Sequence, residues 1–306
     1  MNTEHSIKII YPTLEELIRE DRPAISQSSV NTYLSNLKSL GINNQPQTQK
    51  LYDTDAVLES ISNYKISQQR NLISAIMIIL RANNMRKHTY EMYRQKLYDL
   101  GLIYSKELNK NKKTPTQEKN WIKMDELKKI TKKMLKKNVN QKSLIAALYS
   151  FQPPVRLDYY NMKIVGKDEE TNDKQNYLVV YNTRRKEFVF NDFKTAHKYN
   201  QVVVKVNPEI NRVLNKFLKQ FPNREYLLQQ KNGNPLTRNG LGRMLPRIFK
   251  DTGKEVSINI IRHCYISENT DLEMLKSAKD LAKNMMHSSG VQMNYAKNET
   301  VEEEIN

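Results

Sequence analysis

The sequence has 306 residues and a hydrophobic fraction of 38%, enough for ordinary globular cores and, at this length, for two compact domains. Its 50 Lys and Arg residues against 33 Asp and Glu give a formal net charge of +17. This composition excludes a wholly disordered chain, and the single cysteine, Cys264, excludes an intramolecular disulfide.

The sequence has no apparent membrane span. The longest apolar run, around 73–80, is far shorter than the roughly 20 residues that a membrane span needs. The first residues do not combine a basic start with an apolar stretch, so we expect no secretory signal. One cysteine and no Cys/His cluster at zinc spacing fit a reducing, intracellular compartment and predict no metal and no cofactor.

The excess of positive charge has two explanations, which both stay open here. A strongly basic protein attracts polyanions, and nucleic acid is the natural partner. Lys, Asn and Ile are all abundant, however, as they would be if AT-rich codons raised their numbers regardless of function. Charge alone therefore does not identify a partner.

The first hundred residues carry helical patterns. A capping box over 13–16 opens a short helix. The next helix has Ser26 or Ser28 as its N-cap and Gly41 as its stop, with apolar residues at helical spacing between them. Further helices are predicted at 55–64, 67–81 and 89–100, the last ending at Gly101. Together they predict a small all-α domain over residues 1–105.

Residues 106–120, KELNKNKKTPTQEKN, contain almost no apolar side chain and include Pro115. They predict an exposed, basic linker between two domains. Such a linker could lie along DNA, or it could simply be a solvated connection.

The second predicted domain, 121–306, combines helical patterns with short strand patterns. Helices are predicted at 125–138 and 143–151, and Pro153 with Pro154 stops the second of them. Short strands are predicted at 177–181, 188–190 and 202–206. Helices resume at 209–220, 239–249, 258–267 and 272–285. The predicted fold class is therefore mainly α with a small antiparallel β-sheet (α+β).

The second domain also contains residue types suited to phosphoryl transfer without a metal ion. Such chemistry needs a nucleophile, cations that stabilise the charged phosphate, and an acid for the leaving oxygen. Two guanidinium groups, Arg156 and Arg262, could hold both non-bridging oxygens bidentately. Lys194 lies between the second and third strands, and His287 and Tyr295 lie together near the end of the sequence. Each residue alone is weak evidence, since 17 tyrosines make any one of them more often a packing residue.

The order of these residues is more informative than any one of them. An arginine is followed by a sheet with a lysine in its turn, then Asn-x-x-Arg, then His, then Tyr. This order resembles the catalytic domain of tyrosine recombinases, the phage-type integrase family. The resemblance covers nearly the whole chain, because in that family a helical core-binding domain and a basic linker precede the catalytic domain.

Four segments carry the resemblance. PPVRLDYYNMKI is similar to the first-arginine box, which implies that Arg156 binds phosphate and that Asp158 is the supporting acid. KTAHKYNQVVVKV is similar to the β-hairpin lysine segment, which implies that Lys194 is the acid for the 5'-hydroxyl leaving group. NIIRHCYIS resembles the His-x-x-Arg box, with Asn259 before Arg262.

The last segment, HSSGVQMNY, resembles the final box of the family. This resemblance implies that His287 assists catalysis and that Tyr295 is the nucleophile. Three features depart from the family pattern. Asn259 stands where His or Lys is usual and can donate a hydrogen bond but carry no proton, the acid at Asp158 falls one residue early, and the spacing from His287 to Tyr295 is one residue short.

The resemblance implies a site-specific recombinase or integrase that cleaves and rejoins double-stranded DNA through a 3'-phosphotyrosine. It also implies self-association to a dimer or tetramer on DNA. An AT-biased composition suits a virus or other mobile element, with the protein in host cytoplasm or nucleus if viral, or on the nucleoid if prokaryotic. Two alternatives remain open: a type IB topoisomerase or telomere-resolvase-like enzyme, and a catalytically inactive DNA-binding relative.

Overall fold

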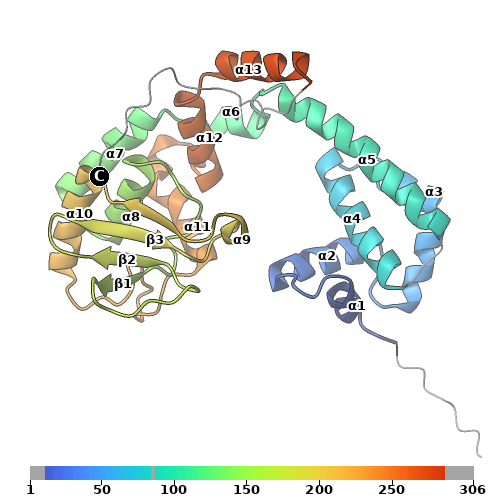
Figure 1. The fold of residues 1–306 in the computed structure, drawn as a ribbon, viewed down its shortest axis with the longest axis horizontal. Helices are drawn as coiled ribbons and strands as arrows, with labels where there is room; N and C mark the ends of the chain where they lie inside the picture. Colours follow the sequence, from blue (N-terminus) through green and yellow to red (C-terminus); the bar gives the residue numbers. More distant parts are fainter. Residues whose placement is uncertain (1–10, 84–86, 287–306) are drawn as a thin grey trace, which may run out of the picture. The chain divides into compact units, whose positions relative to one another are not determined.

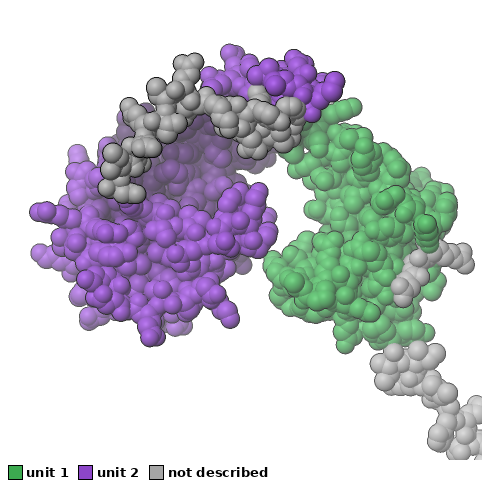
Figure 2. Space-filling model, viewed as in Figure 1, with its two compact units in different colours: residues 1–112 green, residues 113–306 purple. Residues whose placement is uncertain are grey.

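The structure is a computed structural model that describes residues 11–83 and 87–286. The chain divides into two compact units, residues 1–112 and 113–306, which are coloured separately in Figure 2. No helix in the described ranges is both long and apolar enough to cross a membrane.

The first unit is entirely helical over its described residues. Its elements are α1 (Leu14–Asp21), α2 (Gln27–Ser39), the 3-10 helix η1 (Pro46–Tyr52), α3 (Thr54–Ser60), α4 (Ile66–Ala82) and α5 (Lys87–Asn109). The centre is α4, which is buried over most of 72–80 and packs against α1, α2 and α5 (Figure 1). An ion pair between Arg81 and Asp21, 2.7 Å long, joins α4 to α1.

The helix ends of this unit follow the local chemistry of the sequence. Thr13 forms the predicted capping box with Glu16. Ser26, of the two candidates, caps α2 by accepting a hydrogen bond from the Ser29 amide. Gly41 has a φ of 71° just after α2, as expected of a glycine that ends a helix.

The prediction that Gly101 ends the last helix is wrong. Gly101 lies inside α5, and its φ is not in the left-handed range that ends helices. One residue beyond it, Tyr104, still contacts α4, since its ring lies 4.6 Å from the guanidinium of Arg70. Such a contact, worth about 0.5–1 kcal/mol, offsets much of the roughly 1 kcal/mol that a glycine costs in a helix.

The second unit joins helices to one small sheet. Its helices are α6 (Pro115–Asn120), α7 (Met124–Lys137), α8 (Gln141–Ser150), α9 (Ala196–Tyr199), α10 (Pro208–Gln220), α11 (Arg238–Ile248), η2 (Lys250–Thr252), α12 (Ile258–Glu268) and α13 (Leu272–Asn284). Its strands are β1 (Lys163–Gly166), β2 (Tyr177–Val180), β3 (Lys186–Phe190) and β4 (Val202–Lys205). The predicted class, mainly α with a small sheet, is confirmed.

The sheet has the order β1-β2-β3-β4 (Figure 1). The three predicted strands correspond to β2, β3 and β4, and they are antiparallel neighbours as expected. The strand β1 was not predicted and pairs parallel with β2, so the sheet is mixed rather than purely antiparallel.

Helix α8 forms the centre of the second core. All its residues from 143 to 150 are buried, and it packs against α7, α10 and α11. Between α8 and the sheet, the ring of Tyr159 makes edge contacts with Tyr149, Phe188 and Phe190 at centroid distances of 5.2 to 5.7 Å. These contacts fix the segment that follows α8 onto the sheet.

The segment predicted as a linker, 106–120, is exposed over most of its length but contains regular structure. It begins in the last turn of α5 and ends with α6, which is opened by a capping box between Thr114 and Gln117. Asn120 is buried, and its side-chain oxygen accepts a 2.8 Å hydrogen bond from the amide of Glu255. Packing of α6 on the second unit therefore orders this part of the segment.

One buried cation holds the turn between β2 and β3. Lys186 is 3% exposed, and its ammonium group lies 2.5 to 3.3 Å from four oxygens. Two are the carbonyls of Asn182 and Thr183, and two are the side-chain oxygens of Asn211 and Asn215 on α10. Burial lowers the pKa of Lys186, and the four oxygens satisfy the ammonium without a carboxylate.

Candidate active site

The first candidate residue, Arg156, lies in the segment between α8 and β1. Its side chain is exposed, while its backbone carbonyl accepts a 2.8 Å hydrogen bond from the hydroxyl of Tyr149. Burial raises the pKa of Tyr149 well above its usual value, so this hydroxyl stays a neutral donor. The backbone that carries Arg156 is therefore anchored to the core while its guanidinium faces solvent.

The second candidate arginine reaches the same place from a distant part of the sequence. Arg262 projects from α12, and its Nη1 donates a 2.8 Å hydrogen bond to the carbonyl of Pro154, which is 108 residues away in sequence. Burial lowers the pKa of Arg262, and the positive charge of Arg156 lowers it further. Two guanidinium groups close enough to repel each other make a local positive potential that an anion would relieve.

A third arginine, which the sequence did not single out, joins this cluster. Arg238 is the first residue of α11, and its guanidinium forms a 3.1 Å ion pair with the buried carboxylate of Asp158. It also lies over the ring of Tyr160, 5.7 Å from the centroid. Burial raises the pKa of Asp158, and the charges of Arg238 and then Arg156 oppose that increase.

The ion-pair partner of Asp158 is therefore not one of the two arginines that the sequence singled out. The ion pair of Asp158 is with Arg238, while Arg156 acts on it only through its charge. The pair binds the start of α11 to the segment that carries Arg156. No local sequence pattern signals it, because the two partners are 80 residues apart.

Lys194 lies where the sequence predicted it, between the second and third predicted strands. These strands are β3 and β4, and the connecting turn 191–201 includes the short helix α9. The Lys194 side chain is exposed, and it forms no hydrogen bond or ion pair with any residue that the structure describes. Its ammonium group is therefore free to meet a ligand.

Asn259 lies in the first turn of α12 and is exposed. It precedes Arg262 by three residues, a spacing that puts two side chains on the same side of a helix. Tyr265, three residues after Arg262, is half-buried and packs against the core of the second unit.

The two remaining candidates, His287 and Tyr295, lie outside the described residues, which end at Met286 just after α13. Their predicted roles therefore stay predictions. Within the described ranges, no group of three or more His, Cys, Asp or Glu residues is arranged to hold a metal ion.

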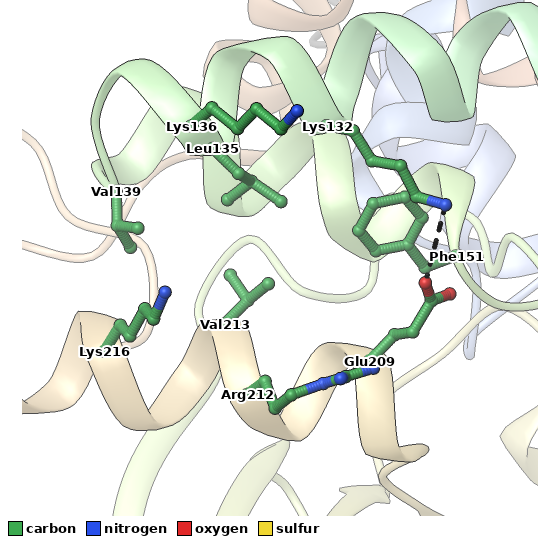
Figure 3. A pocket seen from close by; sticks show the side chains of 9 residues that line it. All are labelled: Lys132, Leu135, Lys136, Val139, Phe151, Glu209, Arg212, Val213 and Lys216. Carbon is green, nitrogen blue, oxygen red and sulfur yellow. Dashed lines mark ion pairs between the residues drawn. The ribbon is translucent and has the colours of Figure 1, made fainter.

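A separate groove lies between α7 and α10 and has a volume of about 490 Å³ (Figure 3). Its apolar residues are Leu135, Val139, Phe151 and Val213, and its cationic ones are Lys132, Lys136, Arg212 and Lys216. The one acidic residue in it, Glu209, is 3.9 Å from Lys132. None of the four catalytic candidates that the structure describes, Arg156, Lys194, Asn259 and Arg262, lines this groove, so we distinguish it from the arginine cluster.

No family model matches the sequence, and the comparison with curated proteins finds no match. The solved structures that are similar to the chain at low identity include three examples. They are a XerA recombinase (13% identity, 94% of each chain covered, TM-score 0.36), a Lambda Integrase fragment of residues 75–356 bound to DNA (13%, 84% of this chain and 88% of that one, 0.44), and a lambda integrase (75–356) dimer bound to a COC' core site (14%, 96% and 98%, 0.42).

Proposed function

We propose that this chain is a DNA breaking and rejoining enzyme of the tyrosine recombinase type. The observation that carries the proposal is the meeting of Arg156 and Arg262. The guanidinium of Arg262 donates a hydrogen bond to the carbonyl of Pro154, two residues before Arg156, and the two positive charges act on each other. Two adjacent guanidinium groups that form no ion pair with a described carboxylate suit the non-bridging oxygens of a phosphodiester.

In the proposed mechanism, the hydroxyl of Tyr295 attacks the phosphorus of one DNA strand. A bond forms between the tyrosine oxygen and phosphorus while the tyrosine proton passes to solvent water, and the bond to the 5'-oxygen breaks. Lys194 gives its proton to that oxygen, which leaves as a 5'-hydroxyl. The 3'-phosphotyrosine conserves the energy of the broken bond, so that attack by a 5'-hydroxyl rejoins a strand and releases the tyrosine.

The other candidates stabilise the charge that grows on the phosphate. Arg156 and Arg262 bind its oxygens, while His287 and Asn259 donate hydrogen bonds nearby. The proposal includes self-association to a dimer or tetramer on DNA, and exchange of strands between two duplexes would require the tetramer. As part of the same proposal, the protein works inside a cell on the DNA of a virus or another mobile element.

The test is the covalent intermediate. The full-length protein is incubated with duplexes enriched from a random-sequence pool by binding, and a denaturing gel then separates protein that carries a DNA strand. A protease-sensitive adduct with a free 5'-hydroxyl on the released strand is expected. Relaxation of any supercoiled plasmid without site preference would favour a topoisomerase, and binding without any adduct would favour an inactive DNA-binding relative.

We expect the affinity for duplex DNA to fall steeply with salt. Lys and Arg side chains that contact phosphates release counterions, so six or more contacts weaken binding by about 10³-fold or more between 50 and 200 mM salt. Fluorescence anisotropy with a labelled duplex measures this directly. An affinity that hardly changes over that range would argue against nucleic acid as the partner.

Lys194→Ala should slow adduct formation by about 100-fold or more on an ordinary duplex, since it removes the proposed general acid. On a duplex with sulfur in place of the 5'-bridging oxygen the effect should be much smaller, because a thiolate leaves without a proton. Adduct rates on the two substrates are compared in single-turnover reactions. Equal slowing on both would mean that Lys194 only helps to hold DNA.

A further inference from the structure

One buried asparagine lies between the two segments that carry Arg156 and Lys194. Asn176 immediately precedes β2, and its side chain is fully buried. Its Nδ2 donates to the backbone carbonyls of Asp158 and Asp192, at 3.0 and 2.9 Å. Its Oδ1 accepts from the backbone amides of Asn191 and Asp192, both at 2.8 Å.

These four hydrogen bonds use the full capacity of the amide, which has two N–H donors and two acceptor positions. A buried polar side chain that is completely satisfied is held in one orientation, because any rotation leaves donors or acceptors unpaired. Asn176 is therefore a rigid four-point connection between two pieces of backbone.

The two pieces of backbone are those of the proposed active site. Asp158 is two residues after Arg156, and Asp192 is two residues before Lys194. The β3–β4 ladder ends with the pair Phe190 and Val202, so the amides of residues 191 and 192 lie beyond the sheet pairing. The side chain of Asn176 supplies the partner that a strand would otherwise provide.

The other contacts of this turn do not reach the Arg156 segment in the same way. The side chain of Asn191 donates to the carbonyls of Asn172 and Gln175, at 3.1 and 2.8 Å, which holds the turn to the loop before β2. The hydroxyl of Tyr160 also lies near the carboxylate of Asp192, since burial and then the charge of Asp192 raise the pKa of Tyr160. That contact uses an exposed carboxylate, whereas Asn176 joins backbone to backbone in the core.

We propose that Asn176 is a positioning residue, which sets the place of Lys194 relative to the phosphate held by Arg156. This inference rests on the proposed function. A general acid must come within hydrogen-bond reach of the leaving oxygen, about 2.6–3.2 Å, and a misplacement of about 1 Å can cost about 100-fold in rate. Lys194 has no side-chain partner among the described residues, so the position of its turn determines where its ammonium group lies.

The test uses Asn176→Ala, which removes all four bonds, and Asn176→Asp, which keeps the two acceptor positions but loses the paired amide donors. Asn211→Ala is the matched control. Asn211 likewise donates to two carbonyls, those of Thr183 and Arg184, but it holds the turn at the opposite end of β3. Five residues of strand separate the two turns by roughly 16 Å.

Adduct rates are measured on the ordinary and the 5'-bridging phosphorothiolate duplex, at a temperature where circular dichroism shows each variant folded. Asn176→Ala should slow the ordinary reaction between about 10- and 100-fold and the sulfur reaction much less, because only the first needs Lys194. Asn176→Asp should likewise raise the ratio of the rate on the sulfur duplex to the rate on the ordinary duplex. Asn211→Ala should leave the ratio unchanged.

Hydrogen exchange gives a second readout, because the amides of Asn191 and Asp192 should exchange faster in Asn176→Ala than in the parent. Unchanged exchange at these amides, or equal slowing on both duplexes while the parent forms adducts, overturns the inference and leaves the proposed function intact. A parent protein that forms no adduct on either duplex overturns the proposed function and this inference with it.

Discussion

Tyr295→Phe is expected to bind duplex DNA with the parental affinity and to form no covalent adduct. The substitution removes only the hydroxyl that attacks phosphorus and keeps the ring and its packing. Binding is measured by anisotropy, and the adduct by denaturing electrophoresis with an end-labelled duplex. The expected change is complete loss of the adduct, because no other group in the proposed mechanism makes the bond.

Tyr265→Phe is the matched control for this experiment. Tyr265 lies on α12 close to Arg262 and packs against the core, so its hydroxyl can be removed with little loss of packing. The variant should form adducts at the parental rate. If the adduct were lost in Tyr265→Phe and kept in Tyr295→Phe, the nucleophile assignment would be overturned.

Arg262→Ala and Arg156→Ala should each reduce the rate of adduct formation by about 10³-fold while leaving most of the DNA affinity. Each arginine acts on charge that develops at one phosphate, whereas affinity is distributed over many phosphate contacts. For Arg262→Ala the carbonyl of Pro154 also loses its donor, which is expected to cost about 1 kcal/mol of folding stability. Single-turnover rates and thermal unfolding separate the two effects.

Arg224→Ala is the control for loss of a half-buried arginine. Burial lowers the pKa of Arg224 as it does that of Arg262, and its Nη1 also donates to a backbone carbonyl, that of Leu227, at 3.2 Å. Its guanidinium lies 5.0 Å from the ring centroids of Phe217 and Phe221, and none of the described catalytic candidates is among its contacts. The variant should lose stability and retain the parental rate when folded. A parental rate in either Arg156→Ala or Arg262→Ala would contradict the proposed phosphate clamp.

Local signals in the sequence were enough for much of the fold. Side-chain caps at Thr13 and Ser26 and the glycine stop at Gly41 are short-range features, and the structure has them where they were expected. At Gly101 the same kind of signal failed, because a glycine is only a weak stop inside a helix and α5 continues past it to a contact between Tyr104 and another helix. The strand β1 was missed because its four residues are fixed by parallel pairing with β2, which no local pattern reveals.

The candidate site likewise has a part that the sequence predicted and a part that it did not. Arg156 and Arg262 could be identified from their order in the sequence, and the structure brings them together. Arg238 and Asn176 could not, because their partners are 80 and 15 to 18 residues away. An asparagine before a strand looks like an ordinary turn residue until the backbone groups around it are known.

The four oxygens that surround the ammonium group of Lys186 bear on how the net charge of the protein is interpreted. AT-rich codons can add lysines wherever a long, solvated side chain is tolerated, and the outer face of α7, with Lys129, Lys133 and Lys137 exposed, is such a place. At position 186 a drift to arginine would replace a compact ammonium by a planar fork that four fixed oxygens do not fit. A bias towards AT-rich codons can therefore add or remove lysines on the outer face of α7. Lys186, in contrast, is constrained by the geometry of its four oxygen partners and, being buried, presents no charge to a polyanion.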